Sequence, residues 1–169
     1  CGVLAIAALG ASFVQNDYSN RYVWQYSNRD MPTVYKISAI WGGMDGSMLL
    51  WSTMLGISGA IVAWRSPRYR TSMMPWVLGT VNTASLFFLS VIAFCTNPFR
   101  YLGTAFPGDG NGLNPLLQNE YMAIHPPMLY AGFTTFTIPY AFCIGALLAG
   151  NLSNEWIRLT RSWTLIAWG

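Results

Sequence analysis

The single histidine of this 169-residue chain is the residue best suited to bind a metal. His125 is followed directly by Pro126 and Pro127, and an uncharged stretch begins at Met128. A residue before proline favours extended backbone, and proline is common in the first turn of a helix. We therefore expect a transmembrane helix to begin near Met128, with the imidazole of His125 held at its outer end. The positive end of a helix disfavours protonation, so the neutral ring would offer a lone pair to iron.

A lone histidine at a membrane interface has a second interpretation, as a polar residue that caps a helix or reaches toward water. A helix N-terminus and nearby basic side chains could also receive carboxylates. The basic residues that could bind such carboxylates are Arg21, Arg29, Lys36 and Arg100. From residue chemistry alone, both interpretations of His125 remain open.

A glycine-rich segment precedes another apolar stretch. Gly42 and Gly43 follow Trp41, and Asp45 and Ser47 come just before the apolar residues. Glycine permits close approach to the backbone, so a planar ligand could lie against this segment. The alternative is a helix capped by Asp45 or Ser47, with Trp41 as an anchor in the headgroup layer. The sequence leaves both alternatives open.

A second polar stretch carries the signals of a short helix. Asn114 before Pro115 marks a helix start. Beyond it, Leu117, Tyr121 and Ile124 fall on one helical face at steps of four and three. We expect a short helix here that lies in the membrane surface.

The elements that must position these residues are membrane-spanning helices. Hydrophobic residues make up 53% of the chain and charged residues only 9%, against roughly 25% charged residues in soluble domains. The expected spans, each uncharged, are residues 2–14, 47–64, 75–95 and 128–149, with the start of another over 163–169. The sequence thus predicts an all-α, polytopic transmembrane bundle. Because both ends fall in apolar runs, we expect a fragment of one transmembrane domain.

Basic residues predict the orientation of the chain. The links 65–74 and 150–162 hold five arginines: Arg65, Arg68, Arg70, Arg158 and Arg161. The positive-inside rule makes these links cytoplasmic. Loops 15–46 and 96–127 then face the other side, and connections of that length are usually functional or structured.

Cysteine spacing and charge argue against other kinds of site. Cys1, Cys95 and Cys143 lie far apart, without the spacing of a metal site or of covalent haem attachment. The net charge of +3 comes with scattered basic residues and gives no support for nucleic-acid binding. The composition instead requires a lipid bilayer as a partner.

Five short motifs occur in order along the chain. They are Trp41-Gly-Gly-x-x-Gly-Ser-x-Leu-Leu-Trp51, Thr96-Asn-Pro-Phe99, Gly112-Leu-Asn-Pro-Leu-Leu-Gln118, His125-Pro-Pro-x-Leu-Tyr130 and Trp163-Thr-Leu-x-Ala-Trp168. Together they resemble the CcmF/NrfE family of cytochrome c maturation, from about Tyr35 to the end of the chain.

This resemblance implies a haem lyase of the bacterial inner membrane, with functional loops that face the periplasm. Such a protein takes haem from a haem chaperone and helps to join its vinyl groups to the cysteine thiols of apocytochrome c, beside other membrane subunits of cytochrome c maturation. The resemblance makes His125 one of two histidine axial ligands of the delivered haem on the outer face, and it implies a second haem, haem b, as a cofactor within the membrane. The other ligands and the tryptophan-rich (WWD-type) haem-handling segment would lie outside this chain. Met44 and Asp45 replace residues that many relatives carry, and we assign them no ligand role.

The candidate haem-pocket residues either lie in these motifs or have flat aromatic rings that could pack against a haem. They are Trp41, Gly42, Gly43, Trp51, Asn114, Tyr121, Pro126, Pro127 and Tyr130, with Arg21, Arg29 and Arg100 as candidate propionate contacts. Anchoring in the membrane interface explains the aromatic residues as well. In this interpretation, His125 holds the iron while the vinyl edges stay open to thiols, and proximity provides most of the catalysis.

Two other classes of function remain open. A haem exporter or secondary transporter would use the outer loops as gates, but the expected spans lack the ionisable residues that usually mark a coupled ion pathway. A respiratory membrane subunit that binds haem to move electrons is compatible with the same residues.

Overall fold

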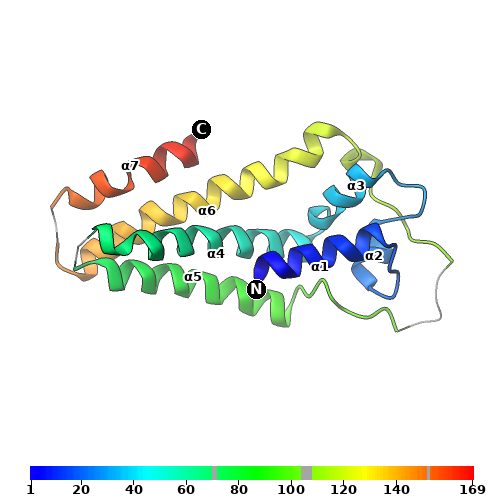
Figure 1. Cartoon of the computed structure of the whole chain (residues 1–169), viewed down its shortest axis with the longest axis horizontal. Helices are drawn as coiled ribbons and strands as arrows, with labels where there is room; N and C mark the ends of the chain where they lie inside the picture. The colour runs from blue at the N-terminus through cyan, green and yellow to red at the C-terminus, as the bar shows by residue number, and fades with distance from the viewer. Residues whose placement is uncertain (70–71, 104–107, 152) are drawn as a thin grey trace. The chain divides into compact units, whose positions relative to one another are not determined.

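The computed structural model describes residues 1–69, 72–103, 108–151 and 153–169, and the regular elements in these ranges are all helices, without a β-strand. The helices are α1 (Gly2–Val14), α2 (Arg21–Tyr26), α3 (Thr33–Ser38), the 3-10 helix η1 (Ala39–Trp41), α4 (Met44–Tyr69), α5 (Met74–Phe94), the 3-10 helix η2 (Pro115–Leu117), α6 (Glu120–Leu148) and α7 (Glu155–Trp168) (Figure 1). The predicted all-α class is confirmed. Arg70, in one of the two basic links, lies outside the described residues.

Three of these helices are long and apolar enough to cross a membrane. They are α4 with 26 residues, α5 with 21 and α6 with 29. Helix α1 is also apolar, but its 13 residues are fewer than the roughly 20 that a crossing needs. These helices therefore indicate a multi-pass membrane protein.

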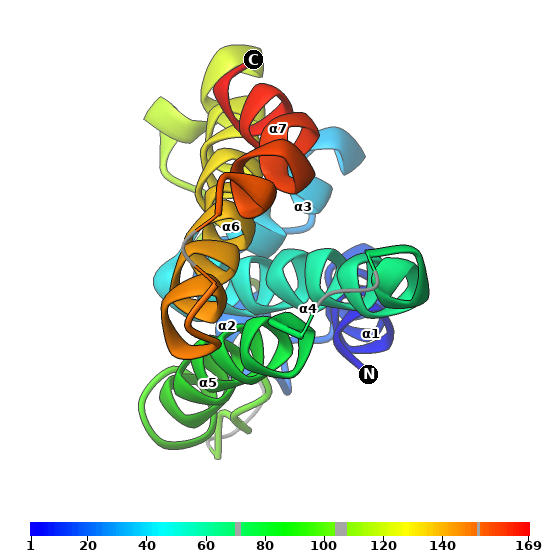
Figure 2. The same cartoon turned by 90° about the vertical axis from the view of Figure 1, so that its left-hand side faces the viewer.

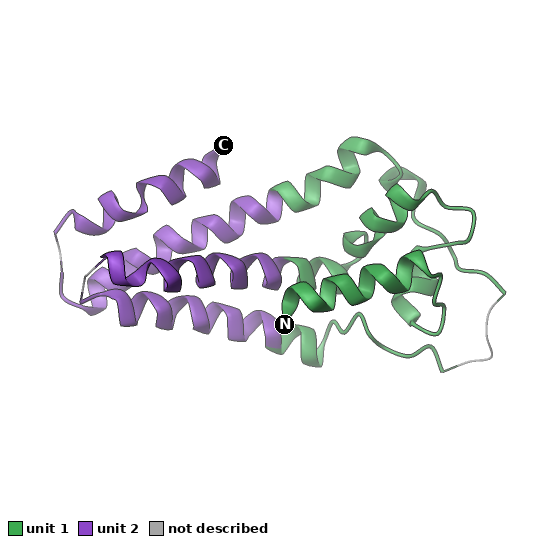
Figure 3. Cartoon of the chain, in the orientation of Figure 1, with its two compact units in different colours: residues 1–50, 90–128 green, residues 51–89, 129–169 purple. Residues whose placement is uncertain are grey.

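The described chain divides into two compact units, shown in two colours in Figure 3. Unit 1 comprises Cys1–Leu50 and Ser90–Met128, and unit 2 comprises Trp51–Leu89 and Leu129–Gly169. Helices α4, α5 and α6 each contribute residues to both units. Each unit has an apolar core of its own.

Unit 2 is a helical bundle whose core draws on α4, α5, α6 and α7. Buried members of this core include Leu55, Val62, Val77, Val81, Ile138, Phe142 and Trp163. At Gly145 a Cβ would come within 2.6 Å of the Val77 side chain and 3.2 Å of the Met73 carbonyl oxygen. Small residues allow membrane helices to approach closely. Gly145 therefore lets α6 lie directly against α5, as Figure 2 shows.

Unit 1 contains the two long polar stretches, residues 15–46 and 96–127, which the sequence predicts to face the same side of the membrane. The backbone N–H of Arg21 donates to the carbonyl of Arg100 (2.9 Å), and that of Asn111 donates to the carbonyl of Trp24 (2.8 Å). The core of unit 1 also draws on both stretches, including Tyr18, Tyr22, Ile40 and Leu113. Because they share one core, the two stretches lie on the same side of any membrane that α4, α5 and α6 cross.

The sequence predicts that helix α6 begins near Met128. In the structure, α6 begins earlier, at Glu120. The side chain of Asn119 accepts a hydrogen bond from the backbone N–H of Tyr121 (2.9 Å) and so satisfies one of the free donors of the first turn. The acidic side chain of Glu120 also suits the positive end of the helix. A capping asparagine and an acidic first residue thus start the helix before the prolines.

The prediction that His125 is extended is wrong, because His125, Pro126 and Pro127 all lie inside α6. The dipole of a helix acts mainly within its first turn, and His125 lies in the second turn of α6. The helix N-terminus therefore gives no argument for a neutral imidazole.

The polar loop before α6 does form a short helix, but this helix is only η2. The side chain of Asn114 accepts from the N–H of Leu116 (3.0 Å), as its helix-start signal indicates. Leu117 packs against the core of unit 1, whereas Tyr121 and Ile124 belong to α6 and are exposed. The predicted surface helix is thus divided between two elements. Likewise, α7 begins at Glu155, before the predicted residue 163.

Candidate functional site

His125 lies on the exposed surface of α6 within unit 1. Among the described residues, no group of three or more His, Cys, Asp or Glu side chains could hold a metal ion. An iron held by a porphyrin needs only one or two axial ligands from protein, because the ring nitrogens supply the rest. Within the described residues, a single exposed imidazole therefore fits a haem iron better than a metal site built from protein ligands alone.

Trp41 contacts the helix that carries His125. Its indole N–H donates to the carbonyl of Ala123 at 2.8 Å. In a regular α-helix this carbonyl accepts from the residue four positions later, and Pro127 has no N–H to donate. The Trp41-Gly-Gly and His125-Pro-Pro motifs are thus joined by a hydrogen bond that the sequence did not predict.

The glycines after Trp41 make room for the protein's own side chains. A Cβ on Gly42 would lie 2.8 Å from the side chain of Leu113, and one on Gly43 would overlap the ring of Tyr26. Leu113 and Tyr26 thus account for glycine at these two positions without a bound ligand, and a ligand role for the glycines stays a prediction.

Neither of the predicted caps occupies the N-terminus of α4. The helix begins at Met44, so Asp45 already lies in its first turn. The hydroxyl of Ser47 donates to the carbonyl of Trp41 (2.9 Å) and does not accept from a free N–H. Ser47 thus ties α4 back to the segment that precedes it.

The predicted aromatic walls are divided between the two units. Trp51 and Tyr130 lie in unit 2, where their rings stack with centroids 5.3 Å apart. Phe88 and Phe133 approach the same indole at 4.8 and 5.6 Å. Trp51 is therefore the centre of an aromatic cluster. Tyr121, in unit 1, is 80% exposed and keeps its ring open to a partner.

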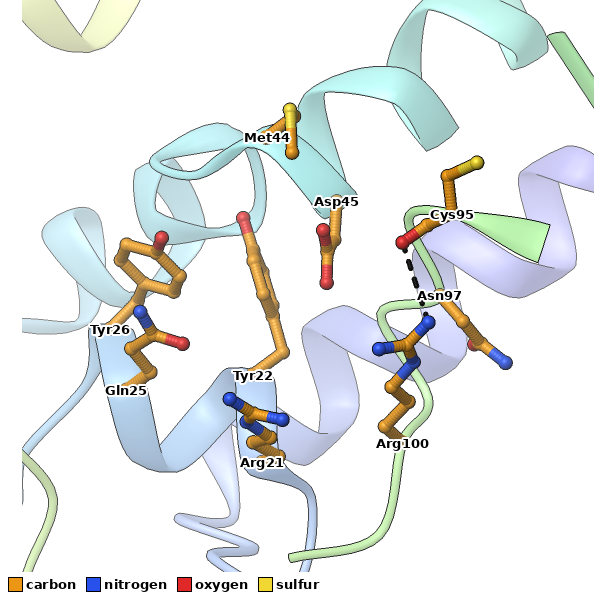
Figure 4. Close-up of a pocket in the computed structure, with 9 residues that line it drawn as sticks. All are labelled: Arg21, Tyr22, Gln25, Tyr26, Met44, Asp45, Cys95, Asn97 and Arg100. Carbon is orange, nitrogen blue, oxygen red and sulfur yellow. Dashed lines mark hydrogen bonds between the residues drawn. The ribbon is translucent and has the colours of Figure 1, made fainter. Parts of the chain in front are cut away.

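Arg21 and Arg100 line one cavity of about 280 Å³ in unit 1, shown in Figure 4. The other residues that line it are Tyr22, Gln25, Tyr26, Met44, Asp45, Cys95 and Asn97. One guanidinium N–H of Arg100 donates to the carbonyl of Cys95 (3.3 Å). Within the described residues, neither arginine forms an ion pair with Asp45. We call this space the arginine cavity.

The other two basic candidates lie outside the arginine cavity. The ammonium group of Lys36 is buried and donates to the side-chain oxygen of Asn16 (2.6 Å) and to the carbonyl of Arg29 (3.3 Å). Arg29 has an exposed side chain, and its backbone N–H donates to the carboxylate of Asp109 (3.0 Å). Of the four basic candidates, the structure therefore brings together Arg21 and Arg100.

A tyrosine–aspartate pair links the two polar stretches. The hydroxyl of Tyr18 donates to Asp109 at 3.0 Å. Burial and this bond raise the pKa of Tyr18 to about 12, whereas backbone N–H groups of Gly110 and Arg29 lower the pKa of Asp109. At neutral pH the phenol is therefore protonated and the carboxylate is ionised, which is the state in which the bond forms.

Sequence reasoning missed Asn20, Tyr22 and Tyr26. The side chain of Asn20 accepts a hydrogen bond from the N–H of Tyr22 (2.8 Å) and caps α2. An asparagine just before a helix is a known start signal, so this role could have been predicted. The hydroxyl of Tyr22 accepts from the N–H of Gly43 (2.9 Å), and burial raises the pKa of this phenol, which keeps it protonated. No local pattern predicts that second contact, because it joins separate elements.

The chain is similar to proteins of cytochrome c assembly. Residues 41–169 match the family model described as cytochrome C assembly protein. Over 165 residues the chain is 39% identical to the cytochrome c-type biogenesis protein CcmF of Haemophilus influenzae, covering 98% of this chain and 26% of that protein. Over 167 residues it is 41% identical to CcmF of Pseudomonas aeruginosa, covering 97% and 25%.

A solved structure described as the cytochrome c haem lyase CcmF superposes on this fold with a TM-score of 0.77 and 27% identity. The superposition covers 99% of this chain and 26% of that one. The NrfE protein of Haemophilus influenzae is 33% identical over 165 residues, covering 98% of this chain and 26% of that protein. The chain thus spans about a quarter of the length of these relatives.

Proposed function

Because this chain belongs to the cytochrome c assembly family that includes CcmF and NrfE, we propose that it is the part of a haem lyase that receives haem at the periplasmic face of the bacterial inner membrane. A haem chaperone delivers haem b, and His125 binds its iron as an axial ligand. The full-length protein then attaches the haem to apocytochrome c together with other membrane subunits. The observation that carries this proposal is the exposed imidazole of His125 on a helix that Trp41 contacts.

Haem is a substrate in this function, and the attachment step is an addition. A cysteine thiol of apocytochrome c adds across a vinyl C=C bond, so that sulfur bonds to one carbon and the proton goes to the other. No oxidant is needed. His125 holds and orients the substrate in this step, and holding two reactants together supplies a large share of the rate by proximity.

The arginine cavity supports the second part of the proposal, in which Arg21 and Arg100 bind the haem propionates. Guanidinium groups bind carboxylates in pairs of parallel hydrogen bonds. The backbone bond between the two residues (2.9 Å) holds the bases of both side chains together. Neither charge is neutralised by an ion pair with Asp45 within the described residues, so both are available for an anionic substrate.

We predict that the double variant Arg21→Ala, Arg100→Ala binds haem at least about ten-fold more weakly, because it loses two hydrogen-bonding charges. The measurement is a haem titration of the full-length protein in nanodiscs. Arg29→Ala is the matched control: it removes an exposed arginine of the same unit, which bonds to Asp109 and Lys36 through its backbone N–H and carbonyl. If Arg29→Ala weakens haem binding as much as the double variant does, the assignment of the arginine cavity is wrong.

The periplasmic orientation rests on the arginines of the two short links, which hold five of the nine basic residues of the chain. We predict that Leu116→Cys in a background without the native cysteines reacts with a membrane-impermeant maleimide in intact spheroplasts, since Leu116 is 78% exposed in unit 1. Arg68→Cys, at the exposed end of α4, is expected to react only after permeabilisation. The opposite labelling pattern would reverse the proposed topology.

A further inference from the structure

The carbonyl of Ala123 needs a hydrogen-bond donor from outside its own helix. Pro127, four positions later, has no N–H and cannot make the regular α-helical bond. An unpaired carbonyl away from water costs free energy comparable to a lost hydrogen bond. Trp41 supplies this donor at 2.8 Å, from a position 82 residues away in the sequence.

Trp41 is itself held firmly enough to act as a fixed donor. It is the last residue of η1, and its carbonyl accepts from the hydroxyl of Ser47 (2.9 Å). Gly42, which follows it, donates its N–H to the carbonyl of Ala39 (3.0 Å). The next residue, Gly43, donates to the buried hydroxyl of Tyr22 (2.9 Å). The backbone is thus fixed on both sides of the indole.

The segment that carries His125 has few other restraints. The side chains of Tyr121, Met122, Ile124 and His125 are all exposed. In the described part of the chain, the side-chain hydrogen bond that reaches residues 122–127 from another element is the one from Trp41. Apart from the backbone of α6 itself, the indole N–H is therefore what ties this turn by a hydrogen bond to another described element.

We propose that Trp41 is a positioning residue for His125: its indole N–H replaces the backbone N–H that Pro127 lacks and so fixes the helical turn that carries the imidazole. The bond itself does not depend on haem, whereas its consequence for haem rests on the proposed function. An anchor in the membrane interface would need the amphipathic indole but no bond to Ala123, so the effect of Trp41→Phe would then be the same with and without Pro127. Phenylalanine keeps an aromatic ring and removes the donor, and its effect in the two Pro127 backgrounds separates the two roles.

The test is a double-mutant cycle in the full-length protein, with hydrogen exchange of the peptide that contains residues 120–128 as the readout. Trp41→Phe is expected to speed exchange there about five-fold, the loss of one ordinary hydrogen bond. Pro127→Ala restores a backbone N–H that can reach Ala123. In that background, the effect of Trp41→Phe is expected to fall below about two-fold.

Two results would overturn the positioning role. One is unchanged exchange in Trp41→Phe, and the other is an equally large effect with and without Pro127. The absorption spectrum of the haem-loaded protein gives the second readout: Trp41→Phe should shift it, and Pro127→Ala should restore it. If the exchange data show coupling while this spectrum stays unchanged, Trp41 fixes the turn but His125 is not the ligand, so the two proposals fail separately.

Discussion

Replacing His125 with alanine in the full-length protein is expected to abolish haem held on the outer face and to lower the yield of cytochrome c at least about 100-fold. Loss of an outer partner of a metal ligand already costs roughly 10–100-fold in affinity, so loss of the ligand itself should cost more. The fold should survive, because the side chain is exposed and such substitutions usually change stability by less than about 0.5 kcal/mol. Haem-stained cytochrome c and the amount of protein in the membrane are measured together.

Met128→Ala is the matched control for this variant. Met128 is 62% exposed on the same helix, close to His125 in the sequence, and its side chain has no part in the proposed site. Cytochrome c yield in this control should stay within about two-fold of the wild type. A normal yield in His125→Ala would remove the histidine from the mechanism, whatever the control shows.

Gly46→Ala is expected to destabilise unit 1 by about 3 kcal/mol or more. Gly46 is buried, and a Cβ there would overlap the carbonyl oxygen of Ile40 and lie 2.6 Å from the hydroxyl of Tyr22. The first of these neighbours is backbone, which cannot turn away as a side chain can. Overpacking that moves side chains alone already costs roughly 1–3 kcal/mol. Relief would require η1 to shift, and Trp41 with it. Thermal unfolding of the full-length protein measures the loss.

The same helix provides a control for the glycine variant. Gly56 also lies in α4, but a Cβ there would meet no atom within 4 Å. Because alanine is a better helix former than glycine by up to about 1 kcal/mol, Gly56→Ala should be neutral or slightly stabilising. Equal melting temperatures for the Gly46 and Gly56 variants would show that the close packing around Gly46 is not important for stability.

The helices with continuous apolar runs could be predicted closely from the sequence. Helix α1 spans Gly2–Val14, and α5 spans Met74–Phe94 against an expected 75–95. Polar residues follow both helices closely, Gln15 and Asn16 after α1 and Thr96 and Asn97 after Cys95, and the bilayer disfavours such residues. The start of α6 could not be predicted in this way, because two prolines normally indicate a boundary. Pro127 leaves the carbonyl of Ala123 without its helical donor, and the indole N–H of Trp41 supplies a donor from 82 residues away in the sequence. No local sequence pattern predicts this contact.

The sequence could identify candidate site residues by the chemistry of their side chains. It could not identify the contacts that depend on how the chain packs. His125, Arg21 and Arg100 follow from their chemistry, and the cavity then selects two of the four basic candidates. Gly42 and Gly43 did indicate close approach, but the partners are Leu113 and Tyr26, and only the folded chain identifies them.

The most direct test of the account supplies the missing ligand from solution. The absorption spectrum of the full-length His125→Gly protein is recorded in membranes with haem supplied, before and after imidazole is added. If His125 binds the iron, the variant lacks the low-spin spectrum of the outer haem, and free imidazole restores it. A wild-type spectrum in His125→Gly without imidazole would contradict the role of His125 as an axial ligand.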